Sequence, residues 1–255
     1  LAVANDLKDP KTNEYGRADK AAAWTLLARL YLNAKVYTGT ERNNDVITYA
    51  NKVISSGYSL KSKYSDLFLA DNNLNNSEVI LSINYDGLKS QTYGGTTFLV
   101  HAAVGGSMAP ADFGIGGGWG GLRVTKNFVN RFTDTNDKRG NFYTQGQSLE
   151  INDLGDFKNG YAFIKYKNVT STGVSGSDKS GVFVDTDLPL YRLSDVYLMY
   201  AEATLRGGNG SLSTALGYIN ALKTRAGAAT ISSGDLTLNF ILDERSRELS
   251  WEFTR

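Results

Sequence analysis

The side chains best suited to binding chemistry lie in a glycine-rich stretch in the middle of the chain. Residues 87–121 contain 11 glycines together with Tyr93 and Trp119. A sugar ring packs its C–H face on an aromatic plane and needs polar partners for its hydroxyls, and Tyr and Trp meet both needs. Lys89 and Gln91 are candidate hydrogen-bond donors to such hydroxyls. The stretch therefore predicts a carbohydrate site, although both rings could instead anchor the loop in the core.

Catalytic and nucleotide chemistry has weaker support. His101 is the single histidine, and no serine or acidic partner stands beside it in a recognisable order, so we expect a loop or pocket-edge histidine and no triad. The glycines at 116–118 are not followed by Gly-Lys-Ser/Thr, which excludes a phosphate loop. Asp86 and Asp112 lie in the right stretch for the carboxylate pair of a glycoside hydrolase, which remains an alternative class.

Two Asx-rich segments offer hard oxygen ligands. Residues 71–76 read Asp-Asn-Asn-Leu-Asn-Asn, and Asp185 and Asp187 flank a threonine. Calcium prefers such ligands, although neither segment forms a full EF-hand loop. Asx-turns at element boundaries explain the same residues equally well.

The composition argues against several other kinds of function and site. Lys and Arg number 27 against 26 Asp and Glu, so the net charge of +1 argues against a nucleic-acid partner and a basic membrane-surface domain. The absence of cysteine excludes disulfides, thiolate metal sites and cysteine nucleophiles. No apolar run of about 18 residues predicts a transmembrane helix, and residues 1–9 do not read as a signal peptide.

The elements that must position the site are mostly helical. Apolar residues at three- and four-residue spacing predict one helix over 19–37, and a second helix ends before Gly57. Small-large spacing resembling tetratricopeptide repeats predicts that the two form a hairpin, although any antiparallel helix pair would look similar. A second pair is expected over 195–206 and 212–226, and a further helix over 240–255.

The middle of the chain has a different pattern of residues, with short alternating segments and many glycines. Alternating residues predict short strands over 78–86 and 161–167, with a short helix over 125–132. The glycine content of 87–121 predicts a loop without regular elements, and 134–159 and 171–181 are expected to be surface connections. The expected fold class is therefore mostly α, with tetratricopeptide-like hairpins, an irregular glycine-rich region and a few short strands.

Five spaced phrases, in collinear order, resemble the SusD/RagB family of nutrient-binding outer-membrane lipoproteins. They are GRADKAAAW at 16–24, ARLYLNA at 28–34, DLPLYRLSD at 187–195, YAEA at 200–203 and DERSREL at 243–249. The resemblance implies capture of glycans without catalysis at the cell surface of a Gram-negative bacterium. It also implies a SusC-like TonB-dependent transporter as partner and an N-terminal lipid anchor.

Within that family, YGGTTFLV at 93–100 and the preceding Asp86 and Gly87 look most like the starch-binding members. The resemblance implies that Tyr93 and Trp119 stack on an α-glucan oligosaccharide. It also implies that Asn73, Asp185 and Asp187 surround a calcium ion, although no cofactor is required. Another glycan or a peptide is the alternative ligand.

The resemblance also sets the expected domain organisation. We expect one SusD-like domain over residues 1–255, as a fragment that lacks N- and C-terminal parts. A helical hairpin is expected in 1–76 and a loop-rich glycan-binding region in 77–181. A second hairpin with the start of a further helix is expected in 182–255.

Overall fold

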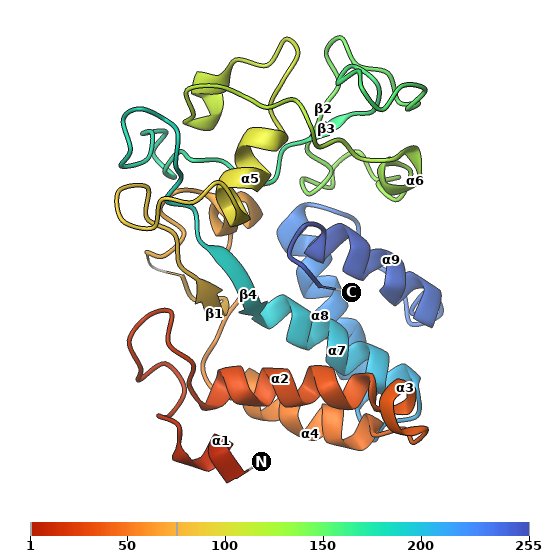
Figure 1. Cartoon of the computed structure of the whole chain (residues 1–255). Coiled ribbons are helices and arrows are strands. Elements are labelled where there is room, and N and C mark those ends of the chain that lie inside the picture. Colours follow the sequence, from red (N-terminus) through yellow and green to blue (C-terminus); the bar gives the residue numbers. More distant parts are fainter. Residues whose placement is uncertain (1, 75, 255) are drawn as a thin grey trace. The chain divides into compact units, whose positions relative to one another are not determined.

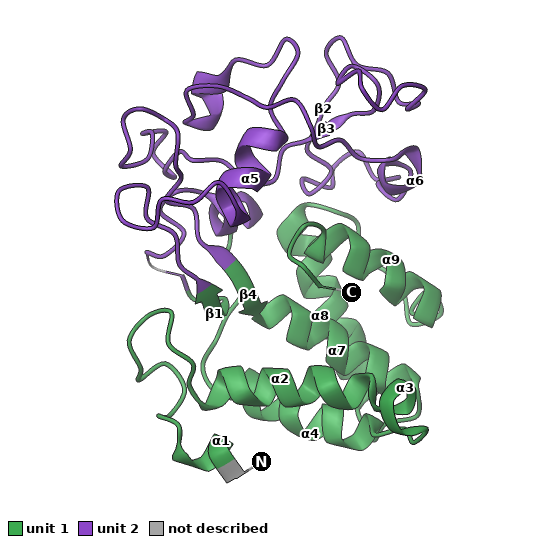
Figure 2. Ribbon diagram, in the orientation of Figure 1, with its two compact units in different colours: residues 1–62, 77–82, 189–255 green, residues 63–76, 83–188 purple. Residues whose placement is uncertain are grey.

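The structure is a computed structural model that describes residues 2–74 and 76–254. Its described residues divide into two compact units (Figure 2). Unit 1 is drawn from residues 1–62, 77–82 and 189–255, and unit 2 from residues 63–76 and 83–188. The units interleave along the chain, and the predicted division at residues 76 and 181 stays a prediction.

Unit 1 is a stack of helices (Figure 1). Its helices are α1 (Ala2–Asp6), α2 (Lys20–Leu32), α3 (Ala34–Thr38), α4 (Asn43–Ile54), α7 (Leu193–Leu205), α8 (Leu212–Ala226) and α9 (Leu238–Leu249). Helix α2 packs on α4, and α7 packs on α4, α8 and α9. Fully buried alanines on three of these helices, Ala28, Ala50 and Ala215, leave room for close approach. The predicted tetratricopeptide-like hairpins are confirmed.

The ends of these helices follow from local sequence. The Asp19 carboxylate accepts a hydrogen bond from the Ala22 amide at 3.0 Å and caps α2 where a helix start was predicted. The predicted helix over 19–37 is divided, because Asn33 leaves helical geometry between α2 and α3. Helix α9 ends at Leu249 and does not continue through 240–255 as predicted, because Trp251 and Phe253 adopt left-handed backbone angles. Arg255 lies outside the described residues.

A buried ionic cluster ties distant segments of unit 1 together. Arg192 lies 2.8 Å from Glu78, 2.6 Å from Glu248 and 2.6 Å from Glu252, and each of these four side chains is almost completely buried. Arg225 completes the cluster through Glu78, at 2.9 Å, and Glu248. Strands β1 (Val79–Ile83) and β4 (Leu188–Arg192) pair beside it in a two-stranded sheet. Two of the five family phrases therefore supply a structural cluster.

Unit 2 consists of loops around short elements. They are η1 (Tyr64–Phe68), α5 (Gly95–Ala102), η2 (Pro110–Phe113), α6 (Lys126–Val129), β2 (Phe142–Tyr143) and β3 (Ala162–Phe163). Strands β2 and β3 pair in antiparallel register, with Phe142 opposite Phe163, and Phe128 packs edge-on against both rings. The strand predicted over 161–167 is reduced to β3. The prediction of a structureless stretch over 87–121 is wrong, because α5 lies within it.

No helix in the described part of the chain combines the length and the apolar character needed to cross a bilayer.

Candidate functional site

Three exposed aromatic rings gather on unit 2. Tyr93, Phe98 and Trp119, which we call the aromatic platform, are 65%, 43% and 45% exposed. The Trp119 ring centroid lies 6.3 Å from that of Tyr93 and 6.1 Å from that of Phe98. Because large aromatic side chains lose apolar contact area when they face water, three adjacent exposed rings mark a candidate binding surface.

The backbone around α5 holds the platform together. The Trp119 amide donates to the His101 carbonyl at 2.8 Å, and the Gly120 amide donates to the Val104 carbonyl at 2.9 Å. A Cβ on Gly118 would lie 2.2 Å from that same Val104 carbonyl oxygen, so a side chain there would force the loop away. Glycine is needed here for a close approach between two backbone segments.

A second support comes from residues 178–183. The Asp178 carboxylate accepts hydrogen bonds from the Ser180 hydroxyl at 2.6 Å and from the Phe183 amide at 3.0 Å. These hydrogen bonds lower the pKa of Asp178 to about 2, and the bond from the Ser180 hydroxyl has the larger effect. Phe183 in turn packs against Tyr93, with ring centroids 5.2 Å apart.

The predicted polar ligand residues are accessible. Lys89 has a side chain that is 86% exposed, and its ammonium lies 3.6 Å from the Asp86 carboxylate. The Gln91 amide donates to the Gly87 carbonyl at 3.4 Å. Neither side chain hydrogen-bonds to the platform rings, so their role toward a ligand stays a prediction.

The residues predicted to surround calcium make other contacts in this structure. Asp185 accepts from the Gly87 amide at 2.7 Å and from the hydroxyl and the amide of Ser177 at 2.6 and 2.5 Å. Asp187 is buried and accepts from the Tyr85 amide at 2.7 Å. Its backbone amide donates to the side-chain oxygen of Asn72 at 3.1 Å.

These donors give the two carboxylates a structural role as loop anchors. In residues 2–74 and 76–254, no group of three or more His, Cys, Asp or Glu side chains is placed to hold a metal ion. The set Asn73, Asp185 and Asp187 therefore stays a prediction, and Asn75, in the same Asx-rich segment, lies outside the described residues.

Sequence reasoning missed three residues at the site. Phe98 belongs to the platform, and Phe183 supports Tyr93 from a distant segment. His101, expected in a loop or at a pocket edge, lies on α5 and is 3% exposed under Trp119. A helical reading of TTFLVHA could have placed Phe98 and His101 on one short helix. The sequence carried no signal for Phe183.

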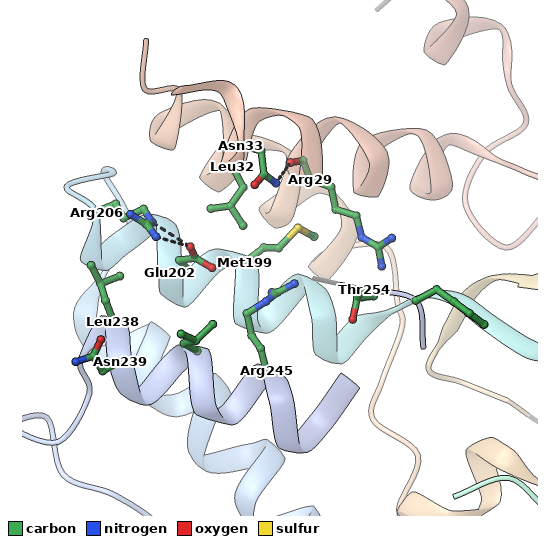
Figure 3. Close-up of a pocket in the computed structure, with 12 residues that line it drawn as sticks. Arg29, Leu32, Asn33, Met199, Glu202, Arg206, Leu238, Asn239, Arg245 and Thr254 are labelled. Carbon is green, nitrogen blue, oxygen red and sulfur yellow. Dashed lines mark hydrogen bonds and ion pairs between the residues drawn. The ribbon is translucent and has the colours of Figure 1, made fainter. Parts of the chain in front are cut away.

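Unit 1 contains a separate hollow of about 400 Å³ between α2, α7 and α9 (Figure 3). Arg206 and Glu202 form an ion pair with a separation of 2.8 Å, which Figure 3 marks with a dashed line. Arg29 and Arg245 both pair with buried Asp195, at 2.8 and 2.9 Å. Burial raises the pKa of Asp195, but the two arginines outweigh it and the pKa lies below its ordinary value. We assign these charges to the helical scaffold.

Comparisons with known proteins agree with this architecture. A model of the SusD family matches residues 142–255. The starch-binding protein SusD of Bacteroides thetaiotaomicron is 32% identical over an alignment of 302 residues, which covers 99% of this chain and 53% of that protein. The chain spans about half the length of the curated relatives it matches.

Solved structures extend the comparison. Surface glycan-binding protein A from Bacteroides thetaiotaomicron has a TM-score of 0.73 at 26% identity, covering 98% of this chain and 56% of that one. A structure with xylogluco-oligosaccharide has a TM-score of 0.69 at 27% identity, covering 98% and 52%. By sequence and by fold, the chain is similar to proteins of the SusD family.

Proposed function

We propose that the chain is a non-catalytic glycan-binding module that captures starch-type α-glucans, such as maltooligosaccharides, on its aromatic platform. The observation that carries the proposal is the placement of Tyr93, Phe98 and Trp119 as adjacent exposed rings. Such rings offer flat apolar faces to the C–H side of sugar rings. The 32% identity to a starch-binding protein supports α-glucan as the ligand class.

Weak binding is expected from the size of the platform. Each stacked ring is worth about 1–3 kcal/mol by analogy with nucleic-acid bases, and each hydrogen bond about 1 kcal/mol net. After the cost of association, two or three rings leave a Kd of roughly millimolar to tens of micromolar. Such a site releases its glycan readily, which suits a protein that passes cargo onward.

In the same proposal, the glycan passes to a SusC-like TonB-dependent transporter. A lipid anchor at the N-terminus of the whole protein holds it at the outer face of the outer membrane. Similarity to the SusD family supports both statements. Purification of the whole protein from native membranes, with mass spectrometry of its N-terminus and of copurifying proteins, tests them. A soluble, unlipidated protein without a transporter would contradict them.

A xyloglucan-type glycan is the second candidate ligand, because a related structure at 27% identity was solved with xylogluco-oligosaccharide. Isothermal titration with maltoheptaose and with xylogluco-oligosaccharide distinguishes the two. We expect maltoheptaose to bind more tightly. Stronger binding of the xyloglucan ligand would overturn the α-glucan assignment without affecting the platform itself.

The hydrolase alternative has little support from the electrostatics. A glycosidase acid needs a raised pKa. Asp86 has a lowered pKa, because its carboxylate accepts hydrogen bonds from the Leu88 and Lys89 amides. Asp86 is therefore unsuited to the role of the general acid. The non-catalytic proposal predicts no release of reducing ends from soluble starch, and measurable release would contradict it.

A further inference from the structure

His101 packs against the platform ring of Trp119 from the protein interior. The imidazole stacks on the indole, with ring centroids 4.8 Å apart and planes 23° apart. His101 is 3% exposed, whereas Trp119 is 45% exposed, so the histidine covers the inner face of the indole. The two residues come from different segments, since α5 carries His101 and the glycine-rich loop carries Trp119.

Two hydrogen bonds, one donated and one accepted by His101, hold that loop on either side of Gly118. The Nδ1 atom lies 2.7 Å from the Gly117 carbonyl oxygen. A carbonyl oxygen only accepts, so Nδ1 carries the proton and donates. The His101 carbonyl accepts the Trp119 amide at 2.8 Å. One residue therefore fixes the backbone before and after Gly118 and also supports the ring that follows.

The remaining ring nitrogen indicates what the imidazole is needed for. Nε2 is buried and has no hydrogen-bond partner among the described residues. A buried polar atom without a partner is costly, and an apolar ring would avoid that cost. Phenylalanine, however, would lose the donor to Gly117. An imidazole combines a flat face, which stacks on Trp119, with a donating edge, which bonds to the Gly117 carbonyl.

We propose that His101 is a positioning residue that sets the plane of Trp119 for stacking on a sugar ring. The inference rests on the glycan-binding function proposed above. A ring that is already held in its binding orientation loses little side-chain freedom when the ligand arrives. His101 strengthens glycan binding through Trp119, without needing to touch the glycan.

Three substitutions separate the two contributions of His101. His101→Phe keeps a flat face and loses the donor, His101→Asn keeps a short donor and loses the ring, and His101→Ala loses both. An aromatic pair contributes enough that losing it weakens maltoheptaose binding by about threefold to tenfold. We expect the largest loss for His101→Ala and smaller losses for the other two. Equal affinity in all three variants and the wild type would overturn the proposal.

A matched control distinguishes positioning from general stability. Leu99 is buried on the same helix, so Leu99→Ala destabilises the fold while it retains the stack of His101 on Trp119. With Trp24 and Trp251 replaced by Phe, fluorescence quenching by acrylamide reports on Trp119 alone. We expect His101→Ala to raise quenching and Leu99→Ala to leave it unchanged. Unchanged quenching in His101→Ala, or the same rise in Leu99→Ala, would refute the positioning role.

A double-mutant cycle with Trp119→Ala completes the test. If His101 acts through Trp119, His101→Ala weakens glycan binding in the wild type and has no further effect in the Trp119→Ala background. An equal additional loss in that background would contradict the proposal. If the wild type binds no glycan, the proposed function fails, while the quenching measurement still decides whether His101 holds the indole.

Discussion

A single methyl group at Gly118 should displace the loop that carries Trp119. The Cβ of an alanine would lie 2.2 Å from the Val104 carbonyl oxygen, 2.6 Å from its carbon and 2.8 Å from a Val104 side-chain atom. Ordinary contact begins near 3.4 Å, so the backbone must shift by about 1 Å. Because the loop lies against rigid backbone, the strain is expected to cost about 1–3 kcal/mol of folding free energy.

The same shift should weaken glycan binding. The hydrogen bonds of Trp119 and Gly120 to the α5 region are 2.8 and 2.9 Å long, and a displacement of about 1 Å takes them beyond the ordinary limit of about 3.2 Å. The indole then loses its fixed orientation. Loss of one stack of about 1–3 kcal/mol predicts at least a fivefold weaker Kd for maltoheptaose in Gly118→Ala.

Gly117→Ala is the matched control. A Cβ there would meet no atom within 4 Å, and Gly117 is not among the glycines with positive φ. We expect unchanged affinity and unchanged or slightly higher thermal stability, since alanine restricts the unfolded chain. Isothermal titration and thermal unfolding of both variants provide the measurement. Wild-type affinity in Gly118→Ala, or an equal loss in Gly117→Ala, would refute the close-packing account.

Two further predictions concern buried or anchored charges. Arg192→Met leaves Glu78, Glu248 and Glu252 without their shared partner and should destabilise unit 1 by about 3–5 kcal/mol in urea unfolding; a change below about 1 kcal/mol would contradict the role of the cluster. The pKa of Asp178 is lowered from 3.8 to about 2, so its stabilisation is complete above the ordinary pKa and is lost as pH falls through the lowered one. Asp178→Asn should therefore lose less thermal stability than the wild type between pH 4 and pH 2, and parallel pH profiles would count against this account.

The helical scaffold could be predicted from the sequence because its signals are local. Small residues such as Ala50 and Ala215 recur beside large ones at helical spacing, and Asp19 marks a helix start by its own side chain. The error over 87–121 has a physical origin. Glycines lower helix propensity on average, but Gly94 and Gly95 stand at the N-terminus of α5 and not in its interior, so the helix forms between them and Ala102.

The site could be predicted only in part, because its support is not local. Tyr93 and Trp119 are identifiable by residue type in a glycine-rich setting. The contact between Tyr93 and Phe183 depends on a turn made around Asp178, and the stack of His101 on Trp119 depends on the path of the loop across α5. Asp185 and Asp187 are identifiable in the sequence as oxygen donors, but their hydrogen bonds with the Gly87 and Tyr85 amides depend on the fold.

The aromatic platform is tested most directly by titrating maltoheptaose into Tyr93→Ala, Trp119→Ala and the double variant. Tyr37, which is 67% exposed on α3 and outside the platform, supplies the control Tyr37→Ala. We predict that each platform variant weakens binding by about fivefold or more, that the double variant abolishes it, and that Tyr37→Ala binds like the wild type. Wild-type affinity in the double variant would contradict the proposal that these rings hold the glycan.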